Sequence, residues 1–331
     1  MQLRFSSKIA ATWLVMGVLW SPAVYAQPSW QVVTPVEVPA HRLDIGQIFA
    51  SRLEALHGSR VSVNSVLHGG GVKALESVLQ PNAAPPYSLV LMAEELALVG
   101  DAAKASAQHV SHYSPLLVVL ETRWCLFGRA DGPVTDARQL LSWARHKASA
   151  PRVAIPVTSG RVRLWVQGMA QRTHRDWQMD TYGVGGEFSQ ALHQGTDLAL
   201  GRCDQQWQHA HRMRILAKGA EIEDGFLPGV PNFSELGWVP FGNGWLAWMA
   251  PNRVPPAERN AMAQHLYKIS QEREVQAHLL GTEQVMVNLT PQASASYIEK
   301  FTQTWNQIGH LLLDQDFGNL KKMQGLAKPR P

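Results

Sequence analysis

Two arginines stand at the start of an expected helix, where positive charge is unfavourable. In the stretch VTSGRVRLW, the turn residues Thr158, Ser159 and Gly160 follow a strand, and Arg161 and Arg163 lie in the first turn of the helix. Positive side chains oppose the helix dipole there, at a cost of roughly 0.3–1 kcal/mol. An anion held by the N–H groups and hydroxyls of the turn would reverse that cost. Solvated arginines that tolerate the dipole are an equally good interpretation.

Glycine clusters mark two further junctions. The stretch HGGGV begins at His68 and contains Gly70 and Gly71 between an expected strand and an expected helix, and YGVGGEF contains Gly185 and Gly186. Adjacent glycines let a ligand approach the backbone closely and leave N–H groups available as donors. Neither cluster has the spacing of a dinucleotide-binding or P-loop fingerprint. A flexible turn explains each cluster almost as well as a ligand site.

Catalytic and metal-binding patterns are weak. The histidine pairs His109/His112 and His209/His211 have no cysteine or carboxylate at a suitable spacing to complete a metal site. The sequence contains neither a nucleophile elbow nor an HExxH motif. We therefore expect a protein that is not an enzyme and that uses no metal and no cofactor.

The N-terminus is typical of a cleavable export signal spanning residues 1–26. Arg4 and Lys8 precede an apolar core from Ile9 to Trp20, and the sequence VYA, ending at Ala26, offers a cleavage site. A membrane anchor is the rival interpretation, but the apolar stretch is short for a bilayer span. We therefore expect a periplasmic protein.

The net charge and the two cysteines further limit the class of protein that the sequence can encode. Loss of the 26 signal residues removes two positive charges and no negative one, so the net charge falls from +4 to +2. This charge is too small to indicate nucleic-acid binding. Cys125 and Cys203 would lie in an oxidising compartment, where they either form a disulfide or remain as buried thiols.

Apolar periodicity predicts two series of alternating strands and helices. The first series has expected strands at 31–36, 60–64 and 87–92 and expected helices at 45–57 and 73–79. The second has expected strands at 152–157, 178–182, 197–201 and 213–217 and expected helices at 162–171 and 187–193. This alternation predicts two α/β units, each a mostly parallel sheet flanked by helices. Residues after 250 are expected to be helical, with Thr290 capping the last helix.

Two long apolar strands, near 115–127 and 243–250, are the expected crossings between the units. They divide the mature chain into a first lobe of residues 27–122 plus 251–331 and a second lobe of residues 123–250. Two α/β lobes joined by a two-strand hinge would hold a ligand in the cleft where helix N-termini from both lobes converge.

The segment around Phe226–Trp238 resembles a known family. The stretch MRILAKGAEIEDGFLPGVPNFSELGWVPFGNGWLAWMAPNRVPPAE is similar to the substrate-binding proteins of tripartite tricarboxylate transporters, the TctC or Bug family. Those proteins carry a strand of the type LRxLA, then lPxVPTxxExG, then an aromatic strand ending in aPxgtP. Supporting stretches in the expected order are DGPVTDARQLLSWAR, VAIPVTSG, YGVGGEFSQALHQGTDLAL and LTPQASASYIEKFTQTWNQI.

The resemblance implies a type II-like periplasmic binding protein with two lobes and a hinge. It would bind a small carboxylate and deliver it to inner-membrane permease subunits, with a monomer expected. In the family, loops at helix N-termini of both lobes hold the ligand carboxylate. The matching positions are Thr158, Ser159 and Gly160 in the second lobe and Gly70 and Gly71 in the first, with Gly185 and Gly186 near the cleft.

This chain departs from the family in both loops. PVEVPAHRLDIGQ, residues 35–47, stands where the first lobe usually has a Gly-Gly loop, and Arg161 and Arg163 stand where small residues are usual. One interpretation is a more anionic or bulkier ligand met by His41, Arg42 and the two arginines. The other is a sensor or interaction protein, contacting a sensor kinase for example, in which the ligand site is altered or lost.

Overall fold

The computed structural model describes eleven segments of the chain. They are residues 30–34, 45–57, 60–65, 72–80, 87–94, 111–156, 160–182, 195–203, 213–219, 227–279 and 284–313. The expected signal segment 1–26 and the expected helix 187–193 lie outside them.

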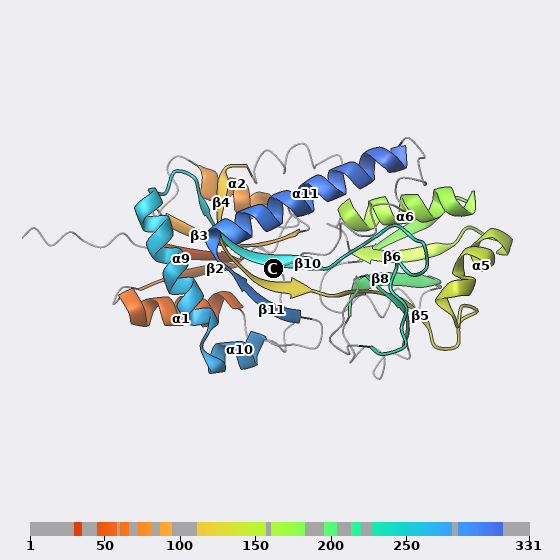
Figure 1. The fold of residues 1–331 in the computed structure, drawn as a ribbon, viewed down its shortest axis with the longest axis horizontal. Helices are drawn as coiled ribbons and strands as arrows, with labels where there is room; N and C mark the ends of the chain where they lie inside the picture. The colour runs from red at the N-terminus through yellow and green to blue at the C-terminus, as the bar shows by residue number, and fades with distance from the viewer. Residues whose placement is uncertain are drawn as a thin grey trace, which may run out of the picture.

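The fold is mixed α/β and contains two separate sheets, which lie in the two halves of the molecule (Figure 1). The first sheet has six strands in the order β11-β4-β10-β3-β1-β2. Their bounds are β1 Trp30–Thr34, β2 Ser62–Ser65, β3 Tyr87–Ala93, β4 Tyr113–Thr122, β10 Gly244–Pro251 and β11 Gln284–Leu289. The β1, β2 and β3 strands are parallel, as the first alternating series predicts, whereas β4, β10 and β11 pair antiparallel.

The second sheet has five strands in the order β7-β6-β8-β5-β9. Their bounds are β5 Trp124–Arg129, β6 Arg152–Pro156, β7 Gln178–Tyr182, β8 Leu198–Arg202 and β9 Met213–Lys218. The strands β6, β7 and β8 are parallel, and β5 runs antiparallel to its neighbours β8 and β9. The expectation of two mostly parallel α/β units is therefore confirmed in its architecture, although the first sheet is half antiparallel.

The chain passes between the sheets at two places. The apolar stretch expected near 115–127 is broken at Arg123 into β4 of the first sheet and β5 of the second. The return differs from the expectation, because β10 lies wholly in the first sheet, between β3 and β4. The returning connection is therefore the irregular segment before β10, and the aromatic strand itself is a central strand of the first sheet.

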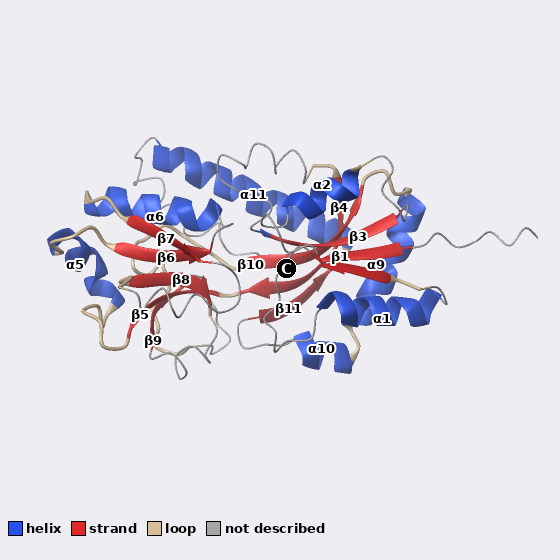
Figure 2. Ribbon diagram, turned by 180° about the vertical axis from the view of Figure 1, so that it is seen from behind, coloured by secondary structure: helices blue, strands red, loops and turns tan. Residues whose placement is uncertain are grey.

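Helices flank both sheets. Their bounds are α1 Ile45–His57, α2 Val72–Leu79, η1 Ala137–Gln139, α5 Leu140–His146, α6 Gly160–Thr173, α9 Pro256–Ser270, α10 Arg273–Leu279 and α11 Pro291–Leu313. Figure 2 shows the two sheets from behind, with α11 running across both halves. It contacts β4 and β11 of the first sheet and α6 above the second. The C-terminal helix therefore ties the two halves together.

Two expectations for the C-terminal part have different outcomes. The expected cap is confirmed, because the backbone N–H of Ala293 donates to Thr290 Oγ1 at 3.4 Å and Pro291 is the first helical residue. The expectation that everything after residue 250 is helical is wrong. The stretch QVMVNL forms β11, which pairs with β4. Its alternating apolar residues are a weak strand signal, and pairing with the open edge of β4 decides its conformation.

The PNFSELGW segment forms one capped turn. Asn232 Oδ1 accepts the backbone N–H of Glu235 at 2.7 Å, and the Glu235 carboxylate accepts from the Asn232 side chain at 2.9 Å and from its backbone at 3.3 Å. This reciprocal pairing is a capping box. Gly237, at φ +67°, ends the turn, and Trp238 N–H donates to Phe233 O as in a Schellman motif. The segment therefore contains a single turn with a cap at each end.

The cysteines form a disulfide. Cys125 of β5 and Cys203 at the end of β8 are bonded, and both are fully buried. Because β5 and β8 are neighbouring antiparallel strands, the bond joins two adjacent strands of the second sheet. It closes a long loop that contains β6, α6 and β7. Of the two states left open by the sequence, the structure has the disulfide.

Candidate functional site

The carboxyl end of β3 carries a buried carboxylate. Glu94 directly follows β3 and is 2% exposed. Trp124 Nε1 donates to its Oε1 at 3.0 Å, and the backbone N–H of Trp245 donates to its Oε2 at 3.1 Å. Ligands of open α/β sheets bind outside the carboxyl ends of parallel strands, so Glu94 lies at the end of the first sheet where a solute is expected.

Gly244 makes room for this carboxylate. A β-carbon placed on Gly244 would overlap the Glu94 side chain. Gly244 is the first residue of β10, which runs antiparallel to β3, so the start of β10 meets the end of β3. A glycine is required at this position because the carboxylate comes too close to the backbone for any side chain.

The partner of Glu94 comes from the second half of the molecule. Arg161, in the first turn of α6, is 1% exposed, and its Nη2 donates to Glu94 Oε1 at 2.9 Å. Its Nη1 donates to the carbonyl oxygens of Phe241 at 3.0 Å and Asn243 at 3.2 Å. The guanidinium therefore joins the end of β3, the start of α6 and the connection that leads into β10.

Aromatic rings surround the Arg161 guanidinium. Its Cζ lies 4.1 Å from the centre of the Phe241 ring and 5.1–5.5 Å from the rings of Trp124, Phe301 and Trp305. Cation–π attraction is strengthened where water is excluded. The rings and the Glu94 carboxylate together compensate the buried charge, which would otherwise be costly.

A second polar group lies beside this pair. Tyr297 of α11 donates to Glu121 Oε1 at 2.7 Å, and Asn243 Nδ2 donates to Glu121 Oε2 at 2.8 Å. Burial and the neighbouring Glu121 carboxylate raise the pKa of the Tyr297 hydroxyl well above its ordinary value. The phenol is thus held in its protonated, hydrogen-bond-donating form.

A pocket that is open to solvent lies between α11 and the connection before β10. Its lining residues are Pro240, Phe241, Gly242, Asn243, Tyr297, Lys300, Phe301, Thr304, Trp305 and Ile308. The lining is mainly apolar, and three of its aromatic rings, those of Phe241, Phe301 and Trp305, also lie beside the Arg161 guanidinium.

Three of the residues predicted for the ligand site are described. Gly160 is the first residue of α6, Arg161 is held by Glu94, and Arg163 is half-buried on the same helix turn. The other nine predicted residues lie outside the described parts of the chain, so their roles stay predictions. They are His41, Arg42, His68, Gly70, Gly71, Thr158, Ser159, Gly185 and Gly186.

Glu94 is not among the site residues predicted from the sequence. The available signal was a carboxylate immediately after the buried strand YSLVLMA, at its carboxyl end. For Arg161 the sequence left open a bound anion or a solvated guanidinium, whereas the structure buries this guanidinium against a carboxylate of the protein. The charge of Arg161 in the first turn of α6 is thereby compensated without a ligand.

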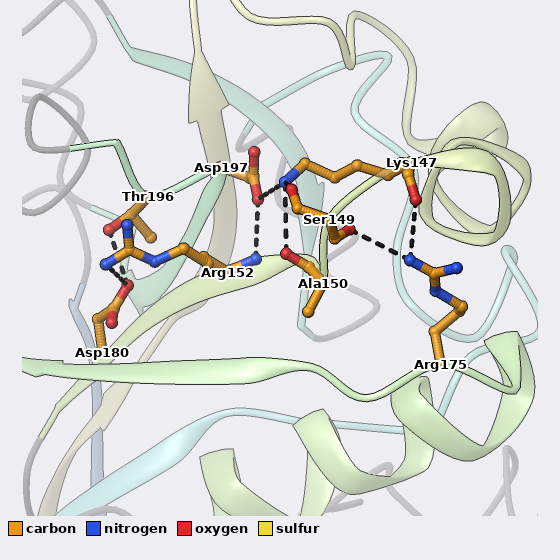
Figure 3. A network of polar contacts seen from close by, with 8 residues as sticks. All are labelled: Lys147, Ser149, Ala150, Arg152, Arg175, Asp180, Thr196 and Asp197. Carbon is orange, nitrogen blue, oxygen red and sulfur yellow. Dashed lines mark hydrogen bonds and ion pairs between the residues drawn. The ribbon is translucent and has the colours of Figure 1, made fainter.

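A polar network in the second half lies at the opposite end of its sheet. Lys147 Nζ pairs with Asp197 at 3.1 Å, and Arg152 pairs with Asp180 at 3.0 Å (Figure 3). Arg152 is the first residue of β6, and Asp197 directly precedes β8. These are the amino ends of parallel strands, so the network fixes the sheet edge and the nearby loop rather than forming a ligand site.

The described segments contain neither a metal-binding cluster nor a helix that could span a membrane. Within them, His, Cys, Asp and Glu side chains form no group of three that could hold a metal ion. In the same part of the chain, no helix combines the length and apolar character needed to cross a membrane.

Comparison with known proteins shows which solved structures share this architecture. The sequence matches no protein-family model and no curated protein. Solved structures with the same fold include the periplasmic binding protein BugD, with a TM-score of 0.70 at 15% identity, covering 87% of this chain and 98% of that one. The fold is that of the Bug and TctC solute-binding proteins. The resemblance first carried by the PGVPNFSELG segment is thus confirmed at the level of the fold.

Two other Bug/TctC-like structures hold carboxylates. R. palustris Rpa4515 with adipate has a TM-score of 0.69 at 15% identity and covers 87% of this chain and 98% of that one. MatC from Rhodopseudomonas palustris with bound malate has a TM-score of 0.69 at 16% identity and covers 86% of this chain and all of the other. These similarities extend over nearly the whole length of each solved protein.

Proposed function

We propose that the protein is a periplasmic solute-binding protein that captures a small organic anion, a carboxylate, between its two lobes. It then presents the closed form to the permease subunits of a tripartite tricarboxylate-type transporter. The observation that carries this proposal is the two-sheet Bug/TctC fold, in which the carboxyl end of β3 and the start of α6 face one another. The disulfide supports an exported, oxidising location.

The ligand class rests on two features. Structures with the same fold hold adipate and malate. The first turn of α6 contains two arginines, and the half-buried Arg163 is not engaged in the Glu94 ion pair. Charge-assisted hydrogen bonds to a carboxylate are stronger than neutral ones, so a positively charged loop at a helix N-terminus would favour an acidic solute.

Thermal unfolding of refolded, ligand-stripped protein tests this function. A panel would contain mono-, di- and tricarboxylates, aromatic acids, phosphates and amino acids. A ligand that binds only the native state must raise its melting temperature at saturating concentration. A shift with one class of carboxylates supports the proposal. The absence of any shift in folded protein would overturn it.

Arg163→Ala makes the test specific. We expect this substitution to weaken binding of the selected anion in calorimetry while the melting temperature of the free protein stays nearly unchanged, because Arg163 is half-buried on the surface of α6. Arg145→Ala is a matched control, since Arg145 is exposed at the far end of the second half, in α5. Equal affinity in the Arg163 variant would remove this residue from the site.

The second candidate function is a periplasmic sensor or interaction protein with the same fold. The observation that favours it is the Glu94–Arg161 pair, in which two buried side chains of the protein occupy the place between the sheets where a ligand would bind. Small-angle scattering would separate the two candidates. A solute-binding protein should become more compact with its ligand, whereas the same dimensions with every compound of the panel would favour the interaction protein.

A further inference from the structure

The carboxylate that meets the arginine of α6 belongs to the protein. Glu94 Oε1 lies 2.9 Å from Arg161 Nη2, and both side chains are at least 98% buried, with exposed fractions of 2% and 1%. We propose that Glu94 is a resident anion, which occupies the guanidinium that would otherwise bind the acid group of a solute.

The position of the pair supports this inference. Glu94 follows the last residue of β3, and Arg161 is the second residue of α6, which itself follows β6. The carboxyl ends of parallel strands and the first turns of helices are where open α/β proteins hold anions. The carboxylate of Glu94 thus has the chemistry and the placement of a bound acid, but it is attached to the chain.

The surroundings are built for a carboxylate. Three donors converge on it: Arg161 Nη2, Trp124 Nε1 and the backbone N–H of Trp245. Gly244 leaves the space that the carboxylate fills, since any β-carbon there would overlap it. Donors from three separate elements therefore define a carboxylate-binding site that is already occupied.

Two consequences follow for the molecule. An acidic solute cannot pair with Arg161, because Glu94 already does, so any recognition of an anion by this chain depends on other groups. Arg163, which does not pair with Glu94, is such a group. Because Glu94 comes from the first sheet and Arg161 from the helix over the second, the resident anion also links the two halves. Glu94 occupies this site whether or not the protein carries a solute.

Chemical rescue tests the proposal. Glu94→Ala removes the carboxylate and leaves its space and its donors. Acetate is the probe, because it has the size and charge of the deleted group. We expect Glu94→Ala to melt at a lower temperature than the wild type, and acetate to raise that temperature in a saturable manner by about 2–4 °C relative to sodium chloride of the same ionic strength.

Two controls make the rescue specific. The double variant Glu94→Ala/Arg161→Met lacks the guanidinium and should show no saturable acetate effect. In the wild type, acetate should cause no rise in melting temperature through this site, because Glu94 occupies it. A rise that acetate causes by binding elsewhere as a solute should be equal in all the proteins, so the wild-type value is subtracted from that of each variant. This arrangement keeps failure of the resident-anion proposal distinct from failure of the proposed transport function.

The outcomes are decisive in each case. A rescue in Glu94→Ala that Arg161→Met abolishes supports the proposal. An acetate response no larger than that of the wild type overturns it. If Glu94→Ala folds only in acetate and not in chloride, the proposal is supported more strongly. If Glu94→Ala stays unfolded in both salts while Glu94→Gln folds, the site does not accept a free carboxylate and the proposal fails.

Discussion

Gly168 of α6 packs against Val239, so closely that a β-carbon on the glycine would lie 2.6 Å from Val239 Cγ2. The same atom would lie 3.0 Å from a methyl carbon of Leu312 on α11. The close approach of α6 to the C-terminal helix therefore depends on the missing side chain, and this contact joins the second half of the molecule to α11.

Gly168→Ala is expected to destabilise the protein despite the better helix propensity of alanine. Propensity alone would favour alanine by up to about 1 kcal/mol, but forcing a methyl group into a packed contact costs roughly 1–3 kcal/mol. Urea unfolding would measure the difference. Gly309→Ala on α11 is the matched control, because its β-carbon would meet Leu164 at an ordinary 3.8 Å. Stabilisation by both substitutions would show that the α6–α11 contact is not tight.

Asn232→Ala should cost about 1 kcal/mol of folding free energy, with up to about 2 kcal/mol expected for a well-ordered cap. The substitution removes both side-chain bonds to Glu235 at the capped turn. Glu235→Gln keeps an acceptor for the Asn232 backbone and should cost less. Denaturant unfolding of the two variants provides the comparison, and equal losses would argue against the capping-box interpretation.

The double substitution Cys125→Ala/Cys203→Ala should lower the free energy of unfolding by about 4 kcal/mol. Cross-linking residues 78 positions apart restricts the unfolded chain, and the expected effect grows with the size of the closed loop. The two sulfur atoms are bonded to each other, so the wild type should show no thiol reactivity even when it is denatured in the absence of a reductant. Titration of two thiols in the denatured, unreduced protein would contradict the disulfide.

Tyr297→Phe should change the dependence of stability on pH. The folded protein keeps the Tyr297 proton at pH values where the unfolded chain, with an ordinary pKa of 10.0, loses it. The resulting stability is fully present below pH 10.0 and is lost as the pH rises towards the higher pKa of the folded state. One such group contributes a slope of at most about 1.4 kcal/mol per pH unit.

The measurement is urea unfolding at pH 8 and at several values above pH 10. At pH 8, Tyr297→Phe should cost about 1.5–3 kcal/mol, because a hydrogen bond to the Glu121 carboxylate is lost. Above pH 10 the variant should lose stability less steeply than the wild type. Tyr113→Phe should act in the same direction, since burial raises the pKa of that hydroxyl too. Parallel pH profiles for the Tyr297 variant and the wild type would refute the prediction.

Most of the fold could be predicted from local patterns. The apolar strands of both sheets, the helix beginning at Pro291 and the turn built by Asn232, Glu235 and Gly237 all follow from periodicity, capping residues and glycine. Motif order also led to the Bug/TctC fold. These features depend on interactions between residues close in the chain, which sequence spacing encodes.

The candidate site was predicted less well. The sequence drew attention to Arg161 because its charge opposes the dipole of α6, but it could not supply the partner, Glu94, which lies 67 positions away. Nor could it show that β10 returns into the first sheet beside β3, a pairing that places Gly244 against the Glu94 carboxylate.

By itself, the sequence determined the two-unit α/β architecture, because strand and helix periodicities are local properties of the chain. Only the tertiary structure decided that Cys125 and Cys203 are bonded, that α11 ties the two halves together, and that the buried arginine of α6 meets a carboxylate from the other sheet. The physical reason is that a buried charge selects its partner by proximity in space, and that proximity exists only after both sheets and the chain crossings between them have formed.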